Sequence, residues 1–253
     1  MDQNPALQRY KLIISYDGTK FCGWQVQQNQ TAIQPLVQKT LETVLRHPID
    51  LTGSGRTDSG VHALGQTAHF DSSVSIDLKK ILLSLNALLP SDIRIRSIEP
   101  VDQTFHARYS VIAKEYHYRL RLDPIADPFA APYQLQVFEK IDLALLKRGC
   151  SLFLGTHDFT SFANEAYRGS AAKDPIRTIF RLDLILEEGG ARLEFEGDGF
   201  LYKMVRNMVG TLLEYGKGKL KDADIDAIFA AKDRRKAGPA VPPRGLCLVS
   251  VKY

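Results

Sequence analysis

Residues 115–122 read Glu-Tyr-His-Tyr-Arg-Leu-Arg-Leu, an alternation of charged or polar side chains with aromatic and aliphatic ones. Successive side chains of a β-strand point to opposite faces of a sheet, so this period of two predicts a strand. Tyr116 and Tyr118 share the apolar face, while Glu115 and His117 share the charged face. Because the pattern extends toward Phe105, we expect strand structure over residues 105–122.

Similar patterns on either side of this stretch predict the remaining elements. Further strands are expected at 10–16, 66–71, 93–95 and 246–251, and on both sides of the turn at 188–190. Apolar residues at helical spacing predict helices over 33–45, 78–89, 142–154, 204–213 and around 225–229. Thr31 and Gln34 resemble a capping box for the first helix. Strands cluster with helices instead of alternating strictly, which favours an α+β fold with a largely antiparallel sheet.

Length and composition exclude several classes of protein. The chain has 253 residues, of which 44% are apolar and 25% are charged, as in ordinary folded domains. A disordered chain, a collagen and a coiled coil are therefore excluded. A membrane span is not expected, because charges interrupt every apolar stretch before the ~18 residues that a span needs.

The cysteines and the start of the chain indicate a cytoplasmic protein. Three cysteines (Cys22, Cys150 and Cys247) lie far apart and form no C-x-x-C pair, so neither a disulfide framework nor a zinc knuckle is expected. The six histidines show no ligand spacing either, and no metal site is predicted. Residues 1–5 contain no basic region followed by an apolar one, so an export signal is not visible.

Basic residues are unevenly distributed although the net charge is only +4. They concentrate within residues 105–121, 201–220 and 232–236, and tyrosines lie between them in the first two stretches. Such clusters combine phosphate neutralisation with aromatic faces for unstacked bases, as a nucleic-acid surface requires. Solvated lysines around ordinary core tyrosines would give the same composition, which by itself does not decide between the two.

The glycine-rich stretch at residues 53–63 carries one carboxylate, Asp58, two residues after Arg56. It lacks the third glycine of a dinucleotide-binding loop, the Gly-Lys-Ser/Thr of a phosphate-binding loop and the G-x-S-x-G of a hydrolase. Glycines allow the backbone to approach a ligand closely. A plain turn in which Asp58 caps backbone amides and pairs with Arg56 is the structural alternative.

Residues 55–63 (Gly-Arg-Thr-Asp-Ser-Gly-Val-His-Ala) resemble the signature of the TruA family of tRNA pseudouridine synthases. The resemblance covers nearly the whole chain in order, and Pro35, where the family usually has glycine, is one departure. The further motifs are Tyr16-Asp17-Gly18-Thr19-x-Phe21-x-Gly23-Trp24-Gln25, Phe105-His106-Ala107-Arg108, Lys114-Glu115-Tyr116-x-Tyr118, Gly155-Thr156-His157-Asp158-Phe159-x-Ser161-Phe162, Met204-Val205-Arg206-Asn207-Met208-Val209-Gly210 and Pro242-Pro243-x-Gly245-Leu246.

The resemblance implies a fold and a division of the chain. The family's pseudouridine-synthase fold has two similar ferredoxin-like α/β halves that share a mostly antiparallel mixed sheet. Helices pack on one side of this sheet, and the active-site cleft lies on the other. We therefore expect an N-terminal half over residues 1–112 with the catalytic Asp loop, and a C-terminal half over residues 113–253 with the active-site Tyr and Arg.

The resemblance also implies an isomerase that converts uridine to pseudouridine in the anticodon stem-loop of tRNA, at positions 38–40, without metal or cofactor. Asp58 matches the family's catalytic aspartate, which is interpreted as the nucleophile. Tyr116 matches the active-site tyrosine that stacks on the base or removes its proton. Arg206 matches the family's buried basic residue, and it is the candidate for the cation that holds the aspartate ionised against desolvation. A phosphate contact or a surface ion pair is the alternative for Arg206.

The remaining expectations concern partners. Arg56, Lys203 and Arg108, together with Tyr116, are predicted to contact RNA, and the target nucleotide must leave its stack to be reached. The family implies a homodimer. His62 lies in the catalytic loop, but we expect a structural hydrogen bond there and not a general base. Tyr118 is expected to serve only in core packing.

Two other functions compete with this interpretation. A non-catalytic RNA-binding module would need the basic clusters but not Asp58, Tyr116 and Arg206 together. A hydrolase acting on a glycosidic bond would need a second carboxylate as proton donor, for which Asp158 and Asp198 are the candidates.

Overall fold

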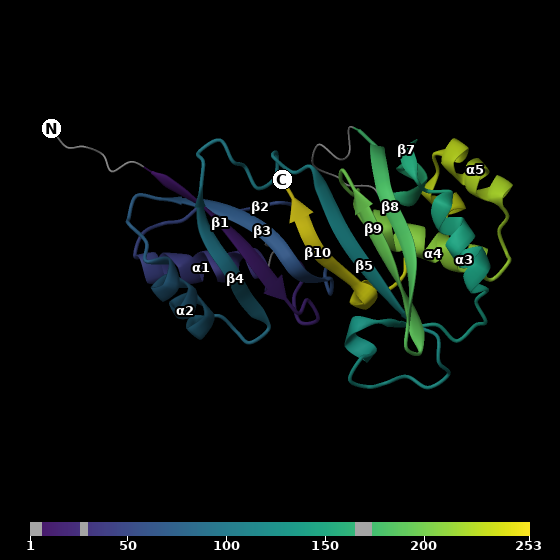
Figure 1. The fold of residues 1–253 in the computed structure, drawn as a ribbon, viewed down its shortest axis with the longest axis horizontal. Helices are drawn as coiled ribbons and strands as arrows, with labels where there is room; N and C mark the ends of the chain where they lie inside the picture. Colours follow the sequence, from purple (N-terminus) through teal and green to yellow (C-terminus); the bar gives the residue numbers. More distant parts are fainter. Residues whose placement is uncertain (1–6, 26–29, 165–173) are drawn as a thin grey trace. The chain divides into compact units, whose positions relative to one another are not determined.

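A computed structural model describes residues 7–25, 30–164 and 174–253, so residues 1–5, where no export signal is visible, lie outside the description (Figure 1). The chain divides into two compact units. Unit 1 comprises Met1–Ile112 and Leu248–Tyr253, and unit 2 comprises Ala113–Cys247. The C-terminal residues therefore belong to the same unit as the N-terminal half of the chain.

Five α-helices and ten strands lie within the described residues. The strands are β1 (Gln8–Tyr16), β2 (Thr52–Gly53), β3 (His62–Ser72), β4 (Ile93–Val101), β5 (Ala113–Arg121), β6 (Leu135–Gln136), β7 (Gly155–Asp158), β8 (Ile176–Glu187), β9 (Gly190–Gly197) and β10 (Leu246–Lys252). The helices are α1 (Ile33–Leu45), α2 (Leu78–Leu88), α3 (Leu143–Ser151), α4 (Met204–Gly216) and α5 (Asp222–Ala231).

Unit 1 is built on three antiparallel strands in the order β4-β1-β3. The short β2 pairs with Ala68 and His69 of β3, and the loop that holds Asp58 joins these two strands. Alternate residues of β1 are buried, among them Leu12 and Ile14, and the helices contribute buried side chains such as Leu41 and Leu85. The sheet and its helices thus enclose one core. The Asp58 loop lies at the N-terminal end of β3, directly before His62.

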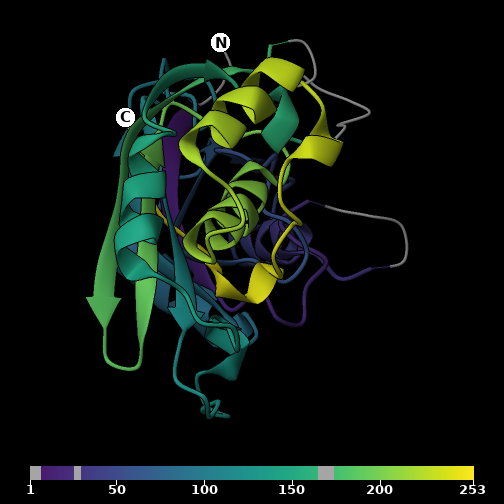
Figure 2. The same ribbon diagram turned by 90° about the vertical axis from the view of Figure 1, so that its right-hand side faces the viewer.

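Unit 2 is built on the antiparallel strands β5-β9-β8-β7, and the two-residue β6 pairs with β5 in parallel. Figure 2, in which this unit faces the viewer, shows α3, α4 and α5 on the same side of the strands. The apolar face of β5 and β9 is buried, with Tyr118, Leu193 and Phe195 fully enclosed. The helix α4 is buried along nearly its whole length and forms the centre of the core.

The predicted α+β class with mostly antiparallel strands is confirmed. Two local predictions are wrong. Residues 105–112 are not part of a strand, and 107–109 form a turn, because the His106 ring nitrogen accepts hydrogen bonds from the backbone N–H groups of Arg108 and Tyr109. The first helix has no capping box at Thr31: its N-cap is Ala32, and the Gln34 side chain donates to the Leu51 carbonyl instead.

Two smaller differences concern unit 2. The third helix ends at Ser151, and residues 155–158 form β7, a strand that the sequence patterns did not indicate. No helix within residues 7–25, 30–164 and 174–253 is both long and apolar enough to cross a membrane.

Candidate active site

The loop that carries Asp58 is held by its backbone and by Thr57. The Thr57 carbonyl accepts a hydrogen bond from the Trp24 N–H at 3.2 Å, and the Thr57 hydroxyl lies 2.8 Å from the Tyr16 hydroxyl in a buried contact. The Asp58 carbonyl accepts from Val61 N–H at 3.1 Å, closing a turn that includes Gly60 at φ +77°. These bonds fix the backbone of Asp58 while its side chain stays half-buried.

Residues 17–25 wrap around this loop at very short range. A Cβ on Gly18 would lie 2.0 Å from the Val61 carbonyl oxygen, and one on Gly23 would lie 2.3 Å from the Thr57 carbonyl oxygen. Gly23 also has φ +105°, a conformation that side-chain-bearing residues rarely adopt. The glycines of the opening motif are therefore required by the close approach of two backbone segments, and this approach supports Asp58.

His62 has the structural role that the sequence predicts. Its Nδ1 atom accepts a hydrogen bond from the Gly18 N–H at 3.1 Å, and the side chain is 6% exposed. The same Nδ1 atom lies 3.2 Å from a carboxylate oxygen of Asp17, so His62 contacts two residues of the opening motif. The ring thus ties the opening motif to the first residue of β3.

Tyr116 lies on β5 in unit 2, with its ring on the apolar face of the strand and 9% exposed. The ring packs edge-to-face on Phe200, with 5.2 Å between the ring centroids. Aromatic pairs of this geometry fix a ring's plane and direction. Tyr116 is therefore held in place from one side by the segment that joins β9 to α4.

Arg206 lies in the first turn of α4 and is half-buried between neighbours that belong to the core. Its Nε atom donates to the Val241 carbonyl at 2.8 Å, and its own carbonyl accepts from the Val241 N–H at 3.3 Å. The side chain does not lie with the Met204, Met208 and Leu212 stripe, which is fully buried. Arg206 is thus bound to a second segment of unit 2 at two points.

The three predicted RNA-contacting cations have different surroundings. Arg56 is exposed on the Asp58 loop, and Arg108 is exposed with its guanidinium 5.9 Å from the centre of the Tyr109 ring. Lys203 immediately precedes α4 with φ +59°, and its ammonium lies 5.1 Å from the centre of the Tyr202 ring. Arg108 and Lys203 each combine a cation with a partly exposed aromatic face, a pairing suited to phosphate and base.

The two carboxylates of the hydrolase alternative are engaged in local structure. Asp158 accepts from the Thr160 N–H at 3.0 Å and pairs with Lys232 at 2.8 Å. Burial by itself would raise the pKa of Asp158, but the hydrogen bonds from Lys232 and Thr160 outweigh it and hold the pKa below its usual value. Asp198 is exposed and accepts from the Thr178 N–H at 3.0 Å. The arrangement of Asp158 is not that of a proton-donating acid, which needs a raised pKa.

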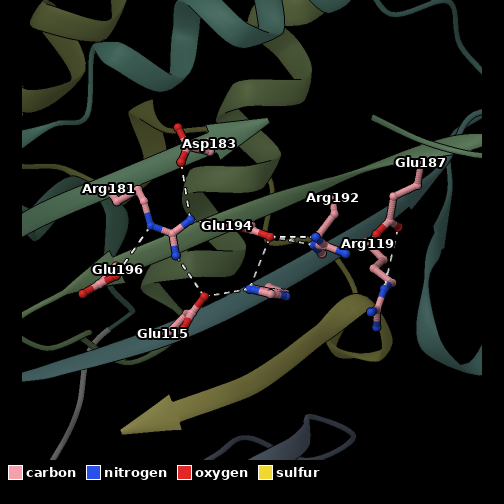
Figure 3. A network of polar contacts seen from close by, with 9 residues as sticks. Glu115, Arg119, Arg181, Asp183, Glu187, Arg192, Glu194 and Glu196 are labelled. Carbon is pink, nitrogen blue, oxygen red and sulfur yellow. Dashed lines mark hydrogen bonds and ion pairs between the residues drawn. The ribbon is translucent and has the colours of Figure 1, made fainter. Parts of the chain in front are cut away.

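The charged face of β5 contains a cluster that the sequence spacing did not indicate. Figure 3 shows Arg181 among the carboxylates of Glu115, Glu194 and Glu196, and ligand atoms of Glu115, His117 and Glu194 lie within 4.8 Å of one another. The carboxylates already accept from guanidinium groups: Arg181 lies 2.9 Å from Glu115 and 2.5 Å from Glu194. The positive charge that a metal would supply is therefore provided by arginine.

The structure thus groups the predicted residues by unit. Asp58 and Arg56 lie on one loop of unit 1, and Arg108 lies in another part of that unit, between β4 and β5. Tyr116, Lys203 and Arg206 lie in unit 2. Sequence reasoning overlooked the residues that hold them, namely Tyr16 beside the Asp58 loop and Val241 beside Arg206.

Comparison with known proteins identifies relatives over nearly the whole chain. A family model described as tRNA pseudouridine synthase matches residues 12–110 and 150–253. The chain is 56% identical over 245 residues to "tRNA pseudouridine synthase A 1" of Protochlamydia amoebophila, covering 96% of each chain. It is 44% identical over 248 residues to "tRNA pseudouridine synthase A" of an Exiguobacterium species, covering 98% of each. It is 43% identical over 250 residues to the protein of that name from Chlamydia felis, covering 98% of this chain and 92% of the relative.

Proposed function

We propose, because this chain belongs to the tRNA pseudouridine synthase family, that it isomerises uridines at positions 38–40, in the anticodon stem-loop of tRNA. As a member of that family it is an isomerase. The observation that carries the proposal is the 56% identity with a tRNA pseudouridine synthase over 96% of both chains. The motifs that resemble the TruA family support the proposed positions within tRNA.

The reaction leaves the composition of the nucleoside unchanged. The bond between N1 and C1′ of uridine breaks, the base turns, and a bond between C5 and C1′ forms. C5 loses its hydrogen to solvent and N1 gains one, so no oxidant, reductant or other co-reactant is consumed. What the protein must supply is a group that acts at the nucleoside and a group that moves the C5 proton.

Asp58 is proposed to be the group that acts at the nucleoside. A carboxylate can add to the sugar or to the base, or remove a proton from the sugar, and each route requires its ionised form. The hydrogen bonds of Thr57 and the close approach of Gly23 support this assignment, because they hold the backbone of Asp58 while leaving its side chain partly open to solvent. Such preorganisation lowers the cost of reaching the reactive geometry.

Tyr116 and Arg206 are proposed to complete the site from unit 2. The Tyr116 ring, fixed against Phe200, would stack on the extruded uracil or take the C5 proton through its phenol. The Arg206 guanidinium would pair with Asp58, offset the desolvation of its carboxylate and keep it ionised. For this pairing the guanidinium has to be held in one orientation, and its bond to Val241 supports that requirement.

The surface contacts and the assembly are proposed from the same resemblance. Arg56, Arg108 and Lys203 would contact the RNA, and the exposure of the first two supports a role at the surface. The active form is proposed to be a cytoplasmic homodimer. The molar mass of the purified protein in solution tests the dimer.

The proposal is tested with tRNA transcripts tritiated at uracil C5, incubated with the pure protein and no added cofactor. In one transcript the only labelled uridines are at positions 38–40, and in the matched transcript these positions are cytidine while other uridines carry the label. We expect tritium release from the first transcript only. Equal release from both would contradict the proposed position, and release from neither would contradict the activity.

A further inference from the structure

Residues 237–242, called here the strap, lie along α4 in unit 2. The Gly238 N–H donates to the Thr211 hydroxyl at 2.9 Å, and the Val241 N–H donates to the Arg206 carbonyl at 3.3 Å. Between these points, a Cβ on Gly210 would lie 1.8 Å from the Pro239 carbonyl oxygen. The strap therefore runs along the helix from Thr211 back to Arg206, at a distance that only glycine allows at position 210.

The strap ends at Arg206 in a reciprocal pair of bonds. Val241 receives the Arg206 Nε–H on its carbonyl at 2.8 Å and returns its own N–H to the Arg206 carbonyl. The guanidinium is planar, so fixing Nε also fixes the directions in which the terminal N–H groups point. The orientation of Arg206 therefore depends on where the carbonyl of Val241 lies.

Tyr118 holds the next carbonyl along the strap. Its hydroxyl donates to the Pro242 carbonyl at 2.8 Å from a side chain that is 0% exposed. A Cβ on Gly245 would lie 2.8 Å from two atoms of the Tyr118 ring, so the chain after the strap also packs against this ring. Burial raises the pKa of the Tyr118 phenol, and the positive charges of Arg206 and Arg244 oppose this only in part. The hydroxyl consequently remains a donor.

We infer that Tyr118 is a positioning residue for Arg206: the hydroxyl of Tyr118 fixes Pro242, and the adjoining Val241 carbonyl fixes the guanidinium. The inference rests on the proposed catalytic role of Arg206. It gives Tyr118 a function beyond core packing, and it accounts for Pro242 and Gly245 in the motif Pro242-Pro243-x-Gly245-Leu246. Because Tyr116 and Tyr118 share β5, one strand would carry both a base-contacting residue and the support of the arginine.

The test is Tyr118→Phe, which keeps the ring and removes the donor. We expect the rate of tritium release at saturating tRNA to fall about 10- to 100-fold, since small displacements of a catalytic group cost this much. Affinity for tRNA should be unchanged, because the hydroxyl is buried away from solvent. The matched control is Tyr215→Phe, which removes another buried phenol from the same unit, one that donates to Asp222. This control should keep the wild-type rate.

A double variant separates the inference from the proposed function. If Tyr118 acts through Arg206, then Tyr118→Phe combined with Arg206→Ala should be no slower than Arg206→Ala alone. A wild-type rate for Arg206→Ala would contradict the proposed role of Arg206. A slow Arg206→Ala together with a wild-type rate for Tyr118→Phe would overturn the inference only.

A second variant covers the case in which Tyr118→Phe does not fold. Thr211→Val preserves the shape of the side chain and removes the hydroxyl that holds Gly238 at the other end of the strap. We expect a smaller decrease in turnover than for Tyr118→Phe, again with unchanged tRNA affinity. An unchanged rate in folded Thr211→Val, alongside an unfolded Tyr118→Phe, would count against the inference. A parallel loss of affinity and rate would also contradict it.

Discussion

Gly23 and Gly218 show how one residue type serves two different purposes. Both have a positive φ, of +105° and +73° respectively. A Cβ on Gly23 would lie 2.3 Å from the Thr57 carbonyl oxygen, whereas one on Gly218 would have nothing within 4 Å. Gly218 is therefore needed for its backbone conformation alone, while Gly23 is needed for its conformation and for the backbone of the Asp58 loop beside it.

Gly23→Ala should destabilise the protein by about 3 kcal/mol, because the strain of a positive φ is added to a backbone clash. Gly218→Ala is the matched control and should cost about 1 kcal/mol, the strain alone. Urea denaturation measures both. The rate of tritium release should fall only in Gly23→Ala, because that clash displaces Thr57 and Asp58. Equal losses of stability in the two variants would contradict this account.

At the residue scale, the sequence pattern predicted on which face of its strand Tyr118 lies, but it did not predict the role of the Tyr118 hydroxyl. Alternation along residues 115–122 is a local signal, and it correctly assigned Tyr118 to the buried face. The partner of its hydroxyl, Pro242, is 124 residues away, and no periodicity relates the two. The family signature likewise marked Asp58 and His62, while the Tyr16 hydroxyl that holds Thr57 became visible only in the fold.

At the scale of the elements, Arg181 is the common ion-pair partner of the carboxylates on the charged face of β5, β9 and β8. This guanidinium lies within 4.0 Å of Glu115, Glu194 and Glu196, whose side chains are between 13% and 18% exposed. Burial alone would raise the pKa of the Glu194 carboxyl, but hydrogen bonds from Arg181 and Arg192 outweigh it and hold the pKa below its ordinary value of 4.5. Glu194 therefore adds stability above that pH and loses it as the pH falls.

Arg181→Gln should destabilise the protein by about 1–3 kcal/mol at pH 7, because partly buried carboxylates lose their donor. The pKa of Glu194 then rises, so the folded variant takes up protons at a higher pH than the wild type. The loss of stability should therefore shrink between pH 7 and pH 4. Urea denaturation at both pH values measures it, with Arg235→Gln as an exposed control that should change little. A loss as large at pH 4 as at pH 7 would be inconsistent with this explanation.

The elements that the sequence predicted well are those with long, regular patterns. Strand β1 and helices α2 and α4 lie close to where periodicity indicated them. The strand predicted over residues 105–110 was wrong because hydrogen bonds from the backbone to the His106 side chain favour a turn there. Strand β7 was missed because its four residues are too few to show a period, and their pairing with β8 is a long-range contact.

At the scale of the whole molecule, the proposed chemistry joins groups from two units. Asp58 belongs to unit 1, while Tyr116 and Arg206 belong to unit 2. Each unit holds its own residues firmly: Thr57 is fixed by Tyr16 and Trp24, and Arg206 is fixed by Val241. The order of motifs along the chain indicated all three residues, but a linear pattern carries no information on how a second segment supports each of them.

The most direct test is the single-turnover rate of tritium release by Asp58→Asn, with tRNA affinity measured on the same preparation. Asparagine preserves the size of the side chain and the backbone bond to Val61, so affinity should stay within about twofold while the rate falls at least about 1,000-fold. Asp198→Asn is the matched control, an exposed aspartate that should keep the wild-type rate. Release by Asp58→Asn at the wild-type rate would contradict the account.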